Sequence, residues 1–517
     1  MTQHRNPRIQ RAILAVLLLA GLFALSLPAG EKEAEAAFRK ALPRDADLVA
    51  FLKAMPKGGE LHTHLAGAVY AEFWLKAALK AGLYYDTAAR LFVDGPGKNR
   101  VPAAQLRTDR KLLSQWLNRV STRGLAVEGM TGHDHFFEAF SYASPAVRAA
   151  YPVEDMLAEV IRRAREQNVG YLEVMAPIVG ADEGVARFRL PTPLPEDPTD
   201  ADLEAAFGAV QPELDRYVSA VKRCLDARDE ALARRLGTPS PTGTAAPFGL
   251  RYITALYRQS PPDELFAPIA FALAAVRADP RVVGVNLLSA EDQPNSDQYF
   301  GAHMRILDFL WKRLGRPAVT LHAGELTLDI APLESLLDRI RTSIETGHAR
   351  RIGHGVSVMW ERDLPGLLRK MRDEGICVEI CLTSNRVILG VAGKAHPFRL
   401  YREARVPLCL NTDDEGVSRT NLTMEFFHAV REQEATYLEL KDLARNSLEY
   451  SFLPGESLYL GRDPARLAPG FEGVRSEGWQ PTAALRERMG KSPRLEALVE
   501  LERAIVRFEA RFPAKPE

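Results

Sequence analysis

Eight short apolar runs, rich in β-branched residues, recur along the chain and alternate with longer stretches of helical periodicity. The runs are apolar on both faces, and amphipathic segments such as 364–374 lie between them, as in parallel strands that are covered by helices. Eight strands of this kind predict an α/β fold, a closed (β/α)8 TIM barrel. The predicted strands are 60–64, 170–174, 250–256, 282–288, 318–322, 351–354, 376–382 and 406–411.

The spacing of these runs is uneven, since the first two are separated by far more than the roughly 30 residues that one strand and its helix need. Long helical insertions therefore have to interrupt the barrel. We expect helices at 71–81, 152–167 and 201–236, and one near 495–511. The predicted parts are a barrel over 31–453 with insertions at about 70–165 and 185–247, and a C-terminal extension, 454–517, packed on the barrel.

The N-terminus predicts export. His4, Arg5, Arg8 and Arg11 precede an uncharged apolar run, 12–27, that is followed by small residues. This order predicts a signal peptide over 1–30. An uncleaved membrane anchor is the alternative, because the apolar run approaches the length that spans a bilayer. We expect the folded part to be periplasmic or secreted, with membrane contact only if the segment stays attached.

Composition argues against several classes of partner. Lys plus Arg and Asp plus Glu both number 67, so no net charge favours nucleic acid, and a small-molecule substrate fits better. The sequence is compatible with a homodimer.

Four scattered cysteines predict core thiols rather than zinc ligands, although a bridge between Cys381 and Cys409 is left open.

Metal-binding side chains stand at the ends of several predicted strands. His62 and His64 lie two apart and share one face of the first strand, so both imidazoles can point at one ion. His322 ends the fifth run, and an acidic cluster over 413–415 ends the eighth. Three imidazoles and a carboxylate suit Zn²⁺, with a position left for water. The absence of Lys in the fourth run favours one ion, although Glu291 could bridge a second.

Five segments stand in this order along the chain: Met-Pro-Lys at 55–57, His-Thr-His at 62–64, His-Ala-Gly-Glu at 322–325, Arg-Ile-Gly-His-Gly at 351–355 and Asn-Thr-Asp-Asp at 411–414. In order and in spacing they resemble the adenosine deaminase family over most of 55–427. Further support comes from 171–174, 381–385 and 396–398. The signal and the long insertion resemble its secreted, growth-factor-like branch less specifically.

The resemblance implies zinc-dependent hydrolytic deamination of adenosine or a related adenine nucleoside. It implies that Glu325 gives a proton to N1 of the purine while activated water attacks C6, and that His354 orients that water. It also implies that Asp413 helps to move the proton that leaves with ammonia, and that Asp414 hydrogen-bonds N7. The implied ligands of the single Zn²⁺ are His62, His64, His322 and Asp413.

The chain departs from the family pattern in the pocket. Ala66 stands where the adenosine-specific enzymes have an Asp for the ribose, and Asn286 and Ser289 replace the expected Asp and Gly after the fourth strand. We therefore expect an adenine-type ring with more certainty than adenosine itself. Ser289 and Glu291 are the remaining candidates for substrate binding, beside Asp414.

Two alternatives remain open at this point. One is a zinc amidohydrolase that acts on another amino-substituted ring or on an amide. The other is a secreted binding or signalling protein that keeps the scaffold without catalysis, against which the intact Glu325 and His354 argue. Considered singly, Glu325 could cap a helix and His354 could be a core residue. The remaining histidines are expected in structural or surface roles: His133, His135, His303, His348, His396 and His428.

Overall fold

The computed structural model describes residues 30–123, 129–142, 152–179, 188–243 and 248–512. The predicted signal segment lies outside these residues, apart from Gly30. Among the described residues, no helix combines the length and the apolar character that crossing a bilayer requires.

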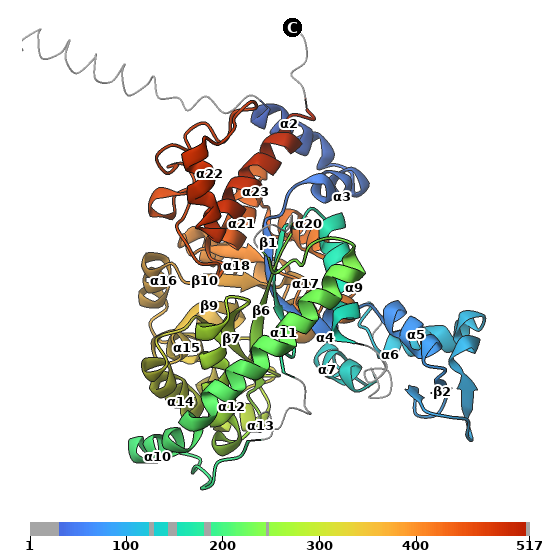
Figure 1. Cartoon of the computed structure of the whole chain (residues 1–517). Helices are drawn as coiled ribbons and strands as arrows, with labels where there is room; N and C mark the ends of the chain where they lie inside the picture. Colours follow the sequence, from blue (N-terminus) through green and yellow to red (C-terminus); the bar gives the residue numbers. More distant parts are fainter. Residues whose placement is uncertain (1–29, 124–128, 143–151, 180–187, 244–247, 513–517) are drawn as a thin grey trace, which may run out of the picture.

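Eight parallel strands form the central sheet, in which every strand pairs with the next one along the chain (Figure 1). All eight predicted strands are present, with ends shifted by a few residues. They are β1 (Gly59–His64), β5 (Tyr171–Met175), β6 (Gly249–Tyr257), β7 (Val282–Leu288), β8 (Val319–Ala323), β9 (Ala349–His354), β10 (Cys377–Ile380) and β11 (Leu408–Leu410).

The sheet closes between β1 and the segment that follows β11. The backbone N–H of His64 donates to the carbonyl of Asp413 over 3.1 Å, and the N–H of Asp413 donates to the carbonyl of His62 over 3.1 Å. Thr63 and Asp413 form a parallel bridge there. This closure makes the sheet the predicted TIM barrel, and it carries three of the predicted zinc ligands in its seam.

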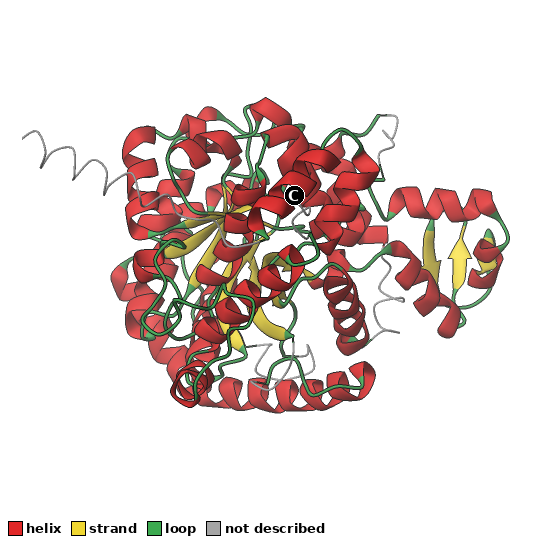
Figure 2. Cartoon of the chain, turned by 90° about the horizontal axis from the view of Figure 1, so that it is seen from above, coloured by secondary structure: helices red, strands yellow, loops and turns green. Residues whose placement is uncertain are grey.

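Helices surround the barrel and cover both its side and its ends (Figure 2). Those before β6 are α2 (Glu31–Ala41), α3 (Asp45–Ala54), α4 (Leu65–Ala68), α5 (Ala71–Lys80), η1 (Ala103–Arg107), α6 (Arg110–Arg119), α7 (Gly132–Tyr142), α9 (Val153–Glu166), α10 (Asp200–Val210), η3 (Gln211–Glu213) and α11 (Leu214–Leu236). Those from β6 to β10 are α12 (Pro262–Ala278), α13 (Pro294–Gln298), α14 (Phe300–Arg313), η4 (Leu333–Ser335), α15 (Arg339–Glu345), η5 (Val356–Trp360) and α16 (Leu364–Glu374). Those after β10 are α17 (Leu382–Leu389), η6 (Gly393–Ala395), α18 (Phe398–Glu403), α19 (Glu415–Ser418), α20 (Leu422–Gln433), α21 (Tyr437–Glu449), η7 (Leu460–Arg462), α22 (Ala483–Gly490) and α23 (Pro493–Glu509).

The first insertion contains helices, as predicted, and also a small sheet that was not predicted. β2 (Tyr84–Asp86) pairs antiparallel with both β3 (Leu91–Val93) and β4 (Arg100–Pro102). This sheet stands with α5 and α6 in a lobe beside the barrel, at the right of Figure 2. An aromatic cluster fills the lobe, because Phe92 lies 5.6 Å from Tyr85 and 5.1 Å from Trp116 between ring centroids.

The predicted helical stretch 201–236 is two helices, α10 and α11, separated by the single turn η3 that contains Pro212. Proline lacks the N–H that would continue the α-helical hydrogen bonds, so the helix is interrupted there. The 23-residue α11 then runs along the barrel and packs against α9 and α12.

The N-terminal and C-terminal helices meet at one end of the molecule, at the top of Figure 1. The predicted C-terminal helix is α23, and it packs against α21 and α2. Buried Lys441 of α21 donates to Glu31 of α2 over 2.5 Å and to Glu509 of α23 over 2.6 Å. One buried ammonium group thus links both ends of the folded chain.

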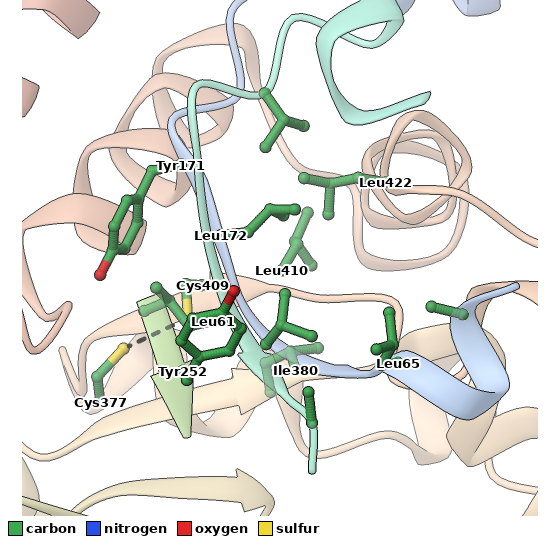
Figure 3. Packing of buried hydrophobic residues seen from close by; sticks show 14 of the residues in the cluster. Leu61, Leu65, Tyr171, Leu172, Tyr252, Cys377, Ile380, Cys409, Leu410 and Leu422 are labelled. Atoms are coloured by element: carbon green, nitrogen blue, oxygen red, sulfur yellow. Dashed lines mark hydrogen bonds between the residues drawn. The ribbon is translucent and has the colours of Figure 1, made fainter. Parts of the chain in front are cut away.

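The core lies between the sheet and its helices, and Figure 3 shows the part beneath β1 and β11. Leu61, Leu172 and Leu410 are at most 2 % exposed, and burial of a leucine of this kind stabilises the fold by roughly 1.5–3 kcal/mol. All four cysteines are free thiols. Cys377 and Cys409 are neighbours, with sulfur atoms 3.8 Å apart, so Cys409 faces Cys377 rather than Cys381.

Candidate active site

Four side chains converge at the carboxyl end of the barrel. His62 and His64 come from β1, His322 from β8 and Asp413 from the turn after β11. The Nε2 atoms of His64 and His322 are 3.2 Å apart, and Asp413 Oδ1 lies 3.4 Å from His62 Nε2 and 3.2 Å from His64 Nε2. Three imidazole nitrogens and one carboxylate oxygen therefore face a common point, as the sequence predicts.

This donor set fits a zinc ion. Three nitrogen ligands and one oxygen ligand match the preference of Zn²⁺, and the site lies open to a cavity from which water can enter. His354 and Asp414 also bring potential ligand atoms into the same region, since ligand atoms of His62, His322, His354 and Asp413 all lie within 4.8 Å of one another, as do those of His64, Asp413 and Asp414.

Several buried polar atoms at this point have no hydrogen-bond partner within the described parts of the chain. They are His62 Nε2, His354 Nε2, Glu325 Oε1 and Asp414 Oδ1. Buried polar groups in proteins are nearly always paired, so a cluster of unpaired ones indicates a place for a ligand. The cluster independently supports a metal ion and a polar substrate at this end of the barrel.

A buried carboxylate holds the far side of the His62 ring. His62 Nδ1 donates to Glu379 Oε2 over 2.6 Å, which leaves Nε2 directed at the site. Glu379 accepts in turn from Arg351 Nε over 2.5 Å. Burial opposes the ionised form of Glu379, but Arg351 and His62 outweigh it and lower the pKa of this carboxyl to about 2. The ionised Glu379 fixes both the tautomer and the orientation of His62.

His322 is fixed in a similar way by an amide. Its Nδ1 donates to Asn286 Oδ1 over 2.9 Å, so Nε2 is the nitrogen that is free to bind a metal. Burial, followed by the nearby histidines, holds the pKa of His322 well below its ordinary value, which keeps the imidazole neutral. Asn286 thus has a structural task at the metal site, which sequence reasoning had noted only as a departure from the family pattern.

Asp413 has two differently engaged oxygens. Oδ2 accepts from Ser384 over 2.7 Å, whereas Oδ1 faces His62 and His64. Burial opposes ionisation of Asp413, but the closeness of these two histidines holds the pKa of this carboxyl well below the ordinary value. Sequence reasoning missed Ser384, because a serine at the start of a helix has no spacing rule that ties it to a distant carboxylate.

The backbone is strained at this site. His354 and Asp413 have φ angles of 66° and 61°, a left-handed conformation that costs energy for residues other than glycine. Gly353 has no room for a side chain, since a Cβ there would lie 2.7 Å from Cε1 of His62. Strained residues of this kind persist where the surrounding contacts hold them, and they concentrate at functional sites.

Glu325 follows β8 and Gly324, as predicted, and is 6 % exposed. Burial, followed by the negative charges of Asp413 and Glu291, raises the pKa of Glu325 well above its ordinary value. The protonated form is therefore favoured. Its carboxyl oxygen Oε1 lies 3.4 Å from His354 Nδ1.

Glu291 lies behind the site rather than in it. Its carboxylate accepts from the backbone N–H groups of Gly324 over 3.1 Å and Glu325 over 3.4 Å, and Arg258 is 3.4 Å away. Glu291 is not among the described residues that line the cavity. It positions the turn that carries Glu325, whereas the sequence had suggested a contact with substrate.

A cavity of about 670 Å³ opens in front of the metal site. The candidate residues His64, His322, Glu325, Asp413 and Asp414 line it, as do Ser289 and Ala66. Ser289 accepts a hydrogen bond from Gln259 over 2.8 Å, and Gln259 and Gln293 also line the cavity. An apolar wall that sequence reasoning did not find consists of Phe136, Phe137 and Phe140 of α7 together with Ile388 of α17.

Comparison with known proteins agrees with this geometry. The sequence model of a family described as adenosine deaminase matches residues 107–458. A protein of Streptomyces virginiae assigned as an adenosine/adenine deaminase is 29% identical over 60% of this chain and 76% of its own length. The adenosine deaminase of Enterococcus faecalis is 34% identical over 28% of this chain, and the match spans 40% of that enzyme.

A solved structure shows the same fold. The N6-methyl-AMP deaminase of Arabidopsis thaliana superimposes with a TM-score of 0.50 and 20% identity, over 78% of this chain and 94% of that one. The family match covers more than half of the sequence and takes in His322, Glu325, His354 and Asp413. The chain belongs to the adenosine deaminase family and is a hydrolase that acts on carbon–nitrogen bonds.

Proposed function

We propose that this protein is a zinc-dependent deaminase that converts adenosine or a related adenine nucleoside to the inosine-type product and ammonia. The observation that carries the proposal is that His62, His64, His322 and Asp413 meet at one point. Three of them, His64, His322 and Asp413, line one cavity together with Glu325. In this reaction water adds to C6 of the ring, the bond from C6 to the amino nitrogen breaks, and that nitrogen leaves as ammonia.

The four residues named would hold one Zn²⁺, which when bound lowers the pKa of a water molecule and so supplies a nucleophile near neutral pH. His62 and His322 are prepared for this task, because Glu379 and Asn286 engage their Nδ1 atoms and leave Nε2 available. Asp413 is held ionised and accepts the proton that the water gives up.

Glu325 is the proton donor to N1 of the purine. Its raised pKa keeps the proton on the carboxyl until substrate arrives, and its Oε1 has no hydrogen-bond partner in the described structure. A proton on N1 prevents negative charge from building up on the ring as water adds to C6. His354, whose Nδ1 lies 3.4 Å from Glu325, orients the water, and Asp414 supplies a hydrogen bond to N7.

The cavity walls suit a purine nucleoside. The phenylalanines of α7 and Ile388 give the flat ring an apolar surface, and Ser289 with its neighbour Gln259 offers polar contacts. Ala66 offers no hydrogen bond to a ribose hydroxyl. We therefore propose an adenine-type ring as the part that is recognised, with the sugar contributing less.

We also propose that the protein acts in the periplasm or outside the cell. The basic residues and the apolar run at the N-terminus support this proposal. Measuring which cell fraction contains the full-length chain, and sequencing its N-terminus there, tests it. Recovery of the uncut chain from the cytosol would contradict it.

A panel of purines tests the activity. Zinc-loaded protein is incubated with adenosine, deoxyadenosine, N6-modified adenosines and guanine derivatives, while absorbance and ammonia are followed and bound metal is determined. We expect ammonia release from at least one adenine nucleoside. Ammonia from none of the adenine compounds, with the metal in place, would reject the proposal and favour an amidohydrolase for another ring or amide.

Replacing the acid isolates its role. In Glu325→Gln the side chain keeps its size but has no carboxyl proton, so we expect turnover to fall by at least about 100-fold while zinc content and thermal stability stay unchanged. Glu374→Gln, on the exposed end of α16, is the matched control. Turnover like that of the wild type in Glu325→Gln would remove the proposed acid.

A further inference from the structure

A chain of hydrogen bonds runs from the backbone of α18 to the ring of His354. The N–H of Phe398 donates to His396 Nδ1 over 3.1 Å, and His396 Nε2 lies 3.0 Å from Asn385 Oδ1. The other end of the same amide, Asn385 Nδ2, lies 3.0 Å from His354 Nδ1. The three side chains are at most 2 % exposed, so solvent does not compete for these contacts.

The donors and acceptors in this chain have only one consistent arrangement. A backbone N–H can only donate, so His396 Nδ1 accepts and the ring carries its proton on Nε2. That N–H needs an acceptor, which places the amide oxygen of Asn385 toward His396 and its NH₂ group toward His354. His354 Nδ1 then accepts, and the neutral ring of His354 has its proton on Nε2.

We propose that Asn385 and His396 are positioning residues that fix the protonated nitrogen of His354, so that this ring meets the reacting water as a hydrogen-bond donor. The inference rests on the proposed deamination. His354 Nε2 is buried and has no other partner among the described residues, which leaves it available for this contact. His354 then stabilises negative charge on the attacking oxygen and does not withdraw its proton.

Other contacts support a fixed ring. The left-handed φ of 66° at His354 is held by the following residue, since Tyr401 donates from its hydroxyl to the carbonyl of Gly355 over 2.7 Å. Glu325 Oε1 lies 3.4 Å from His354 Nδ1. That nitrogen has a single lone pair, which Asn385 occupies, so it does not compete for the carboxyl proton of Glu325.

Asn385→Asp reverses the donor and acceptor roles between this side chain and His354 and leaves the size of the side chain unchanged. A carboxylate only accepts, so it would draw the proton of His354 to Nδ1 and leave a lone pair on Nε2 facing the site. We expect kcat to fall by about 100-fold, as for other catalytic histidines held in the wrong tautomer or deprived of a supporting contact. KM, zinc content and thermal stability are expected to stay close to those of the wild type.

A matched control variant shows how much kcat changes when an amide elsewhere in the protein is replaced by a carboxylate. Asn446→Asp, on α21, alters an amide that donates to the carbonyl of Leu408 and belongs to no part of the proposed site. It is expected to retain its kcat. If Asn385→Asp keeps a kcat within twofold of the Asn446→Asp value, the positioning role is wrong.

His396 offers a second pair of variants. In His396→Gln the amide NH₂ can reach the place of the lost Nε2–H and still donate to Asn385, whereas in His396→Asn the shorter side chain cannot. In His396→Asn, Oδ1 can take the place of Nδ1 and accept from the N–H of Phe398, whereas His396→Gln loses this acceptor, so thermal stability is measured for both variants and kcat is compared on folded protein. We expect His396→Gln to retain kcat within about threefold and His396→Asn to lose at least tenfold. Equal kcat values in the two variants would overturn the proposal.

The tautomer of His354 can be measured without an activity assay. Nitrogen-15 spectra of protein labelled at histidine distinguish Nδ1–H from Nε2–H, and the resonances of His354 are identified by their loss in His354→Gln. We expect Nε2–H in the wild type and Nδ1–H in Asn385→Asp. A wild-type His354 protonated on Nδ1 would overturn the proposal, and failure of the deamination assay alone would leave this reading intact.

Discussion

At the scale of single residues, the proposed metal ligands depend on partners that lie behind them. His62 is held by Glu379, which is also bound to Arg351, and Arg351 reaches Glu173 over 2.6 Å. The charges in this buried row alternate in sign and so neutralise one another. Glu379, the member next to His62, leaves Nε2 of that ring directed at the proposed metal. Metal affinity should therefore depend on Glu379 although it is not a ligand.

Glu379→Gln tests this dependence. The neutral amide is a weaker acceptor for Nδ1–H of His62, so we expect the affinity for zinc to fall by about 10-fold to 100-fold, measured by competition with a chelator. Glu173→Gln is the matched control, because it removes the other carboxylate of Arg351 and leaves the contact with His62. Equal affinities in the two variants would contradict the account.

The sequence predicts those site residues whose chemical type and position at strand ends form a recognisable pattern. His62, His64, His322, Glu325 and Asp413 stand at strand ends, and the structure brings them together. Their supporting residues could not be predicted, because an amide or hydroxyl such as that of Asn286, Ser384 or Asn385 has many uses in a fold. His396 was expected in a structural or surface role, and its link to His354 becomes visible only when the structure brings the turn before α18 against Asn385 of α17.

At the scale of secondary structure elements, the strand ends set the geometry of the site. The seam between β1 and the segment after β11 holds His62, His64 and Asp413 through backbone hydrogen bonds. β9 passes so close to β1 that Gly353 touches the ring of His62. A side chain at this glycine would push apart the two strands that carry His62 and His354.

Gly353→Ala tests how closely the strands must approach. The new Cβ would lie 2.7 Å from His62 Cε1, so we expect a loss of about 1–3 kcal/mol in the free energy of unfolding, together with weaker zinc binding. Gly301→Ala, in α14, meets no atom within 4 Å and should stabilise the protein slightly. Unchanged zinc affinity in Gly353→Ala would show that the strands tolerate the extra atom.

The helix α17 carries Ser384 and Asn385, and a buried carboxyl holds its first turn. Glu425 of α20 accepts from the N–H of Thr383 over 3.1 Å and from the hydroxyl of Thr420 over 2.8 Å. Burial dominates these hydrogen bonds and raises the pKa of Glu425 to about 7. The folded protein therefore keeps a proton here at pH values at which the unfolded chain has lost it.

The sign of the pH effect follows. A raised folded pKa stabilises the protein fully below the ordinary value of 4.5, and this contribution is lost as pH rises through about 7. Over that window it amounts to about 3 kcal/mol. Urea unfolding of wild type and Glu425→Gln at pH 5 and pH 8 should show the wild type losing about 2.5 kcal/mol of this relative to the variant, because the unfolded carboxyl is already mostly ionised at pH 5. A difference that does not change with pH would contradict this role of Glu425.

Secondary structure elements were predicted correctly where their hydrophobic periodicity extends over enough residues to be recognised. All eight barrel strands were predicted, and 364–374 coincides with α16. The strands β2, β3 and β4 were missed because each has three residues, too few for an alternating pattern to stand out. The wall that α7 adds to the cavity was missed because its phenylalanines have the spacing of ordinary core residues.

At the scale of the whole molecule, the barrel gathers residues that are up to about 350 positions apart into one site. The terminal helices α2 and α23 meet at Lys441, at the top of Figure 1, and the lobe with β2 stands beside the barrel. The topology of eight strands in sequence order explains how a ligand pair near the N-terminus reaches an acidic cluster near residue 413. Closure of the barrel is what completes the metal site.

Zinc titration tests the central claim most directly. Protein stripped of metal by a chelator receives increasing zinc, and ammonia release from adenosine, or from whichever adenine nucleoside the panel identifies, is measured at each step. We expect no release without metal, and a rise that reaches its plateau at one equivalent per chain. Full activity in the metal-free protein, or a plateau that needs two equivalents, would contradict a single ion held by His62, His64, His322 and Asp413.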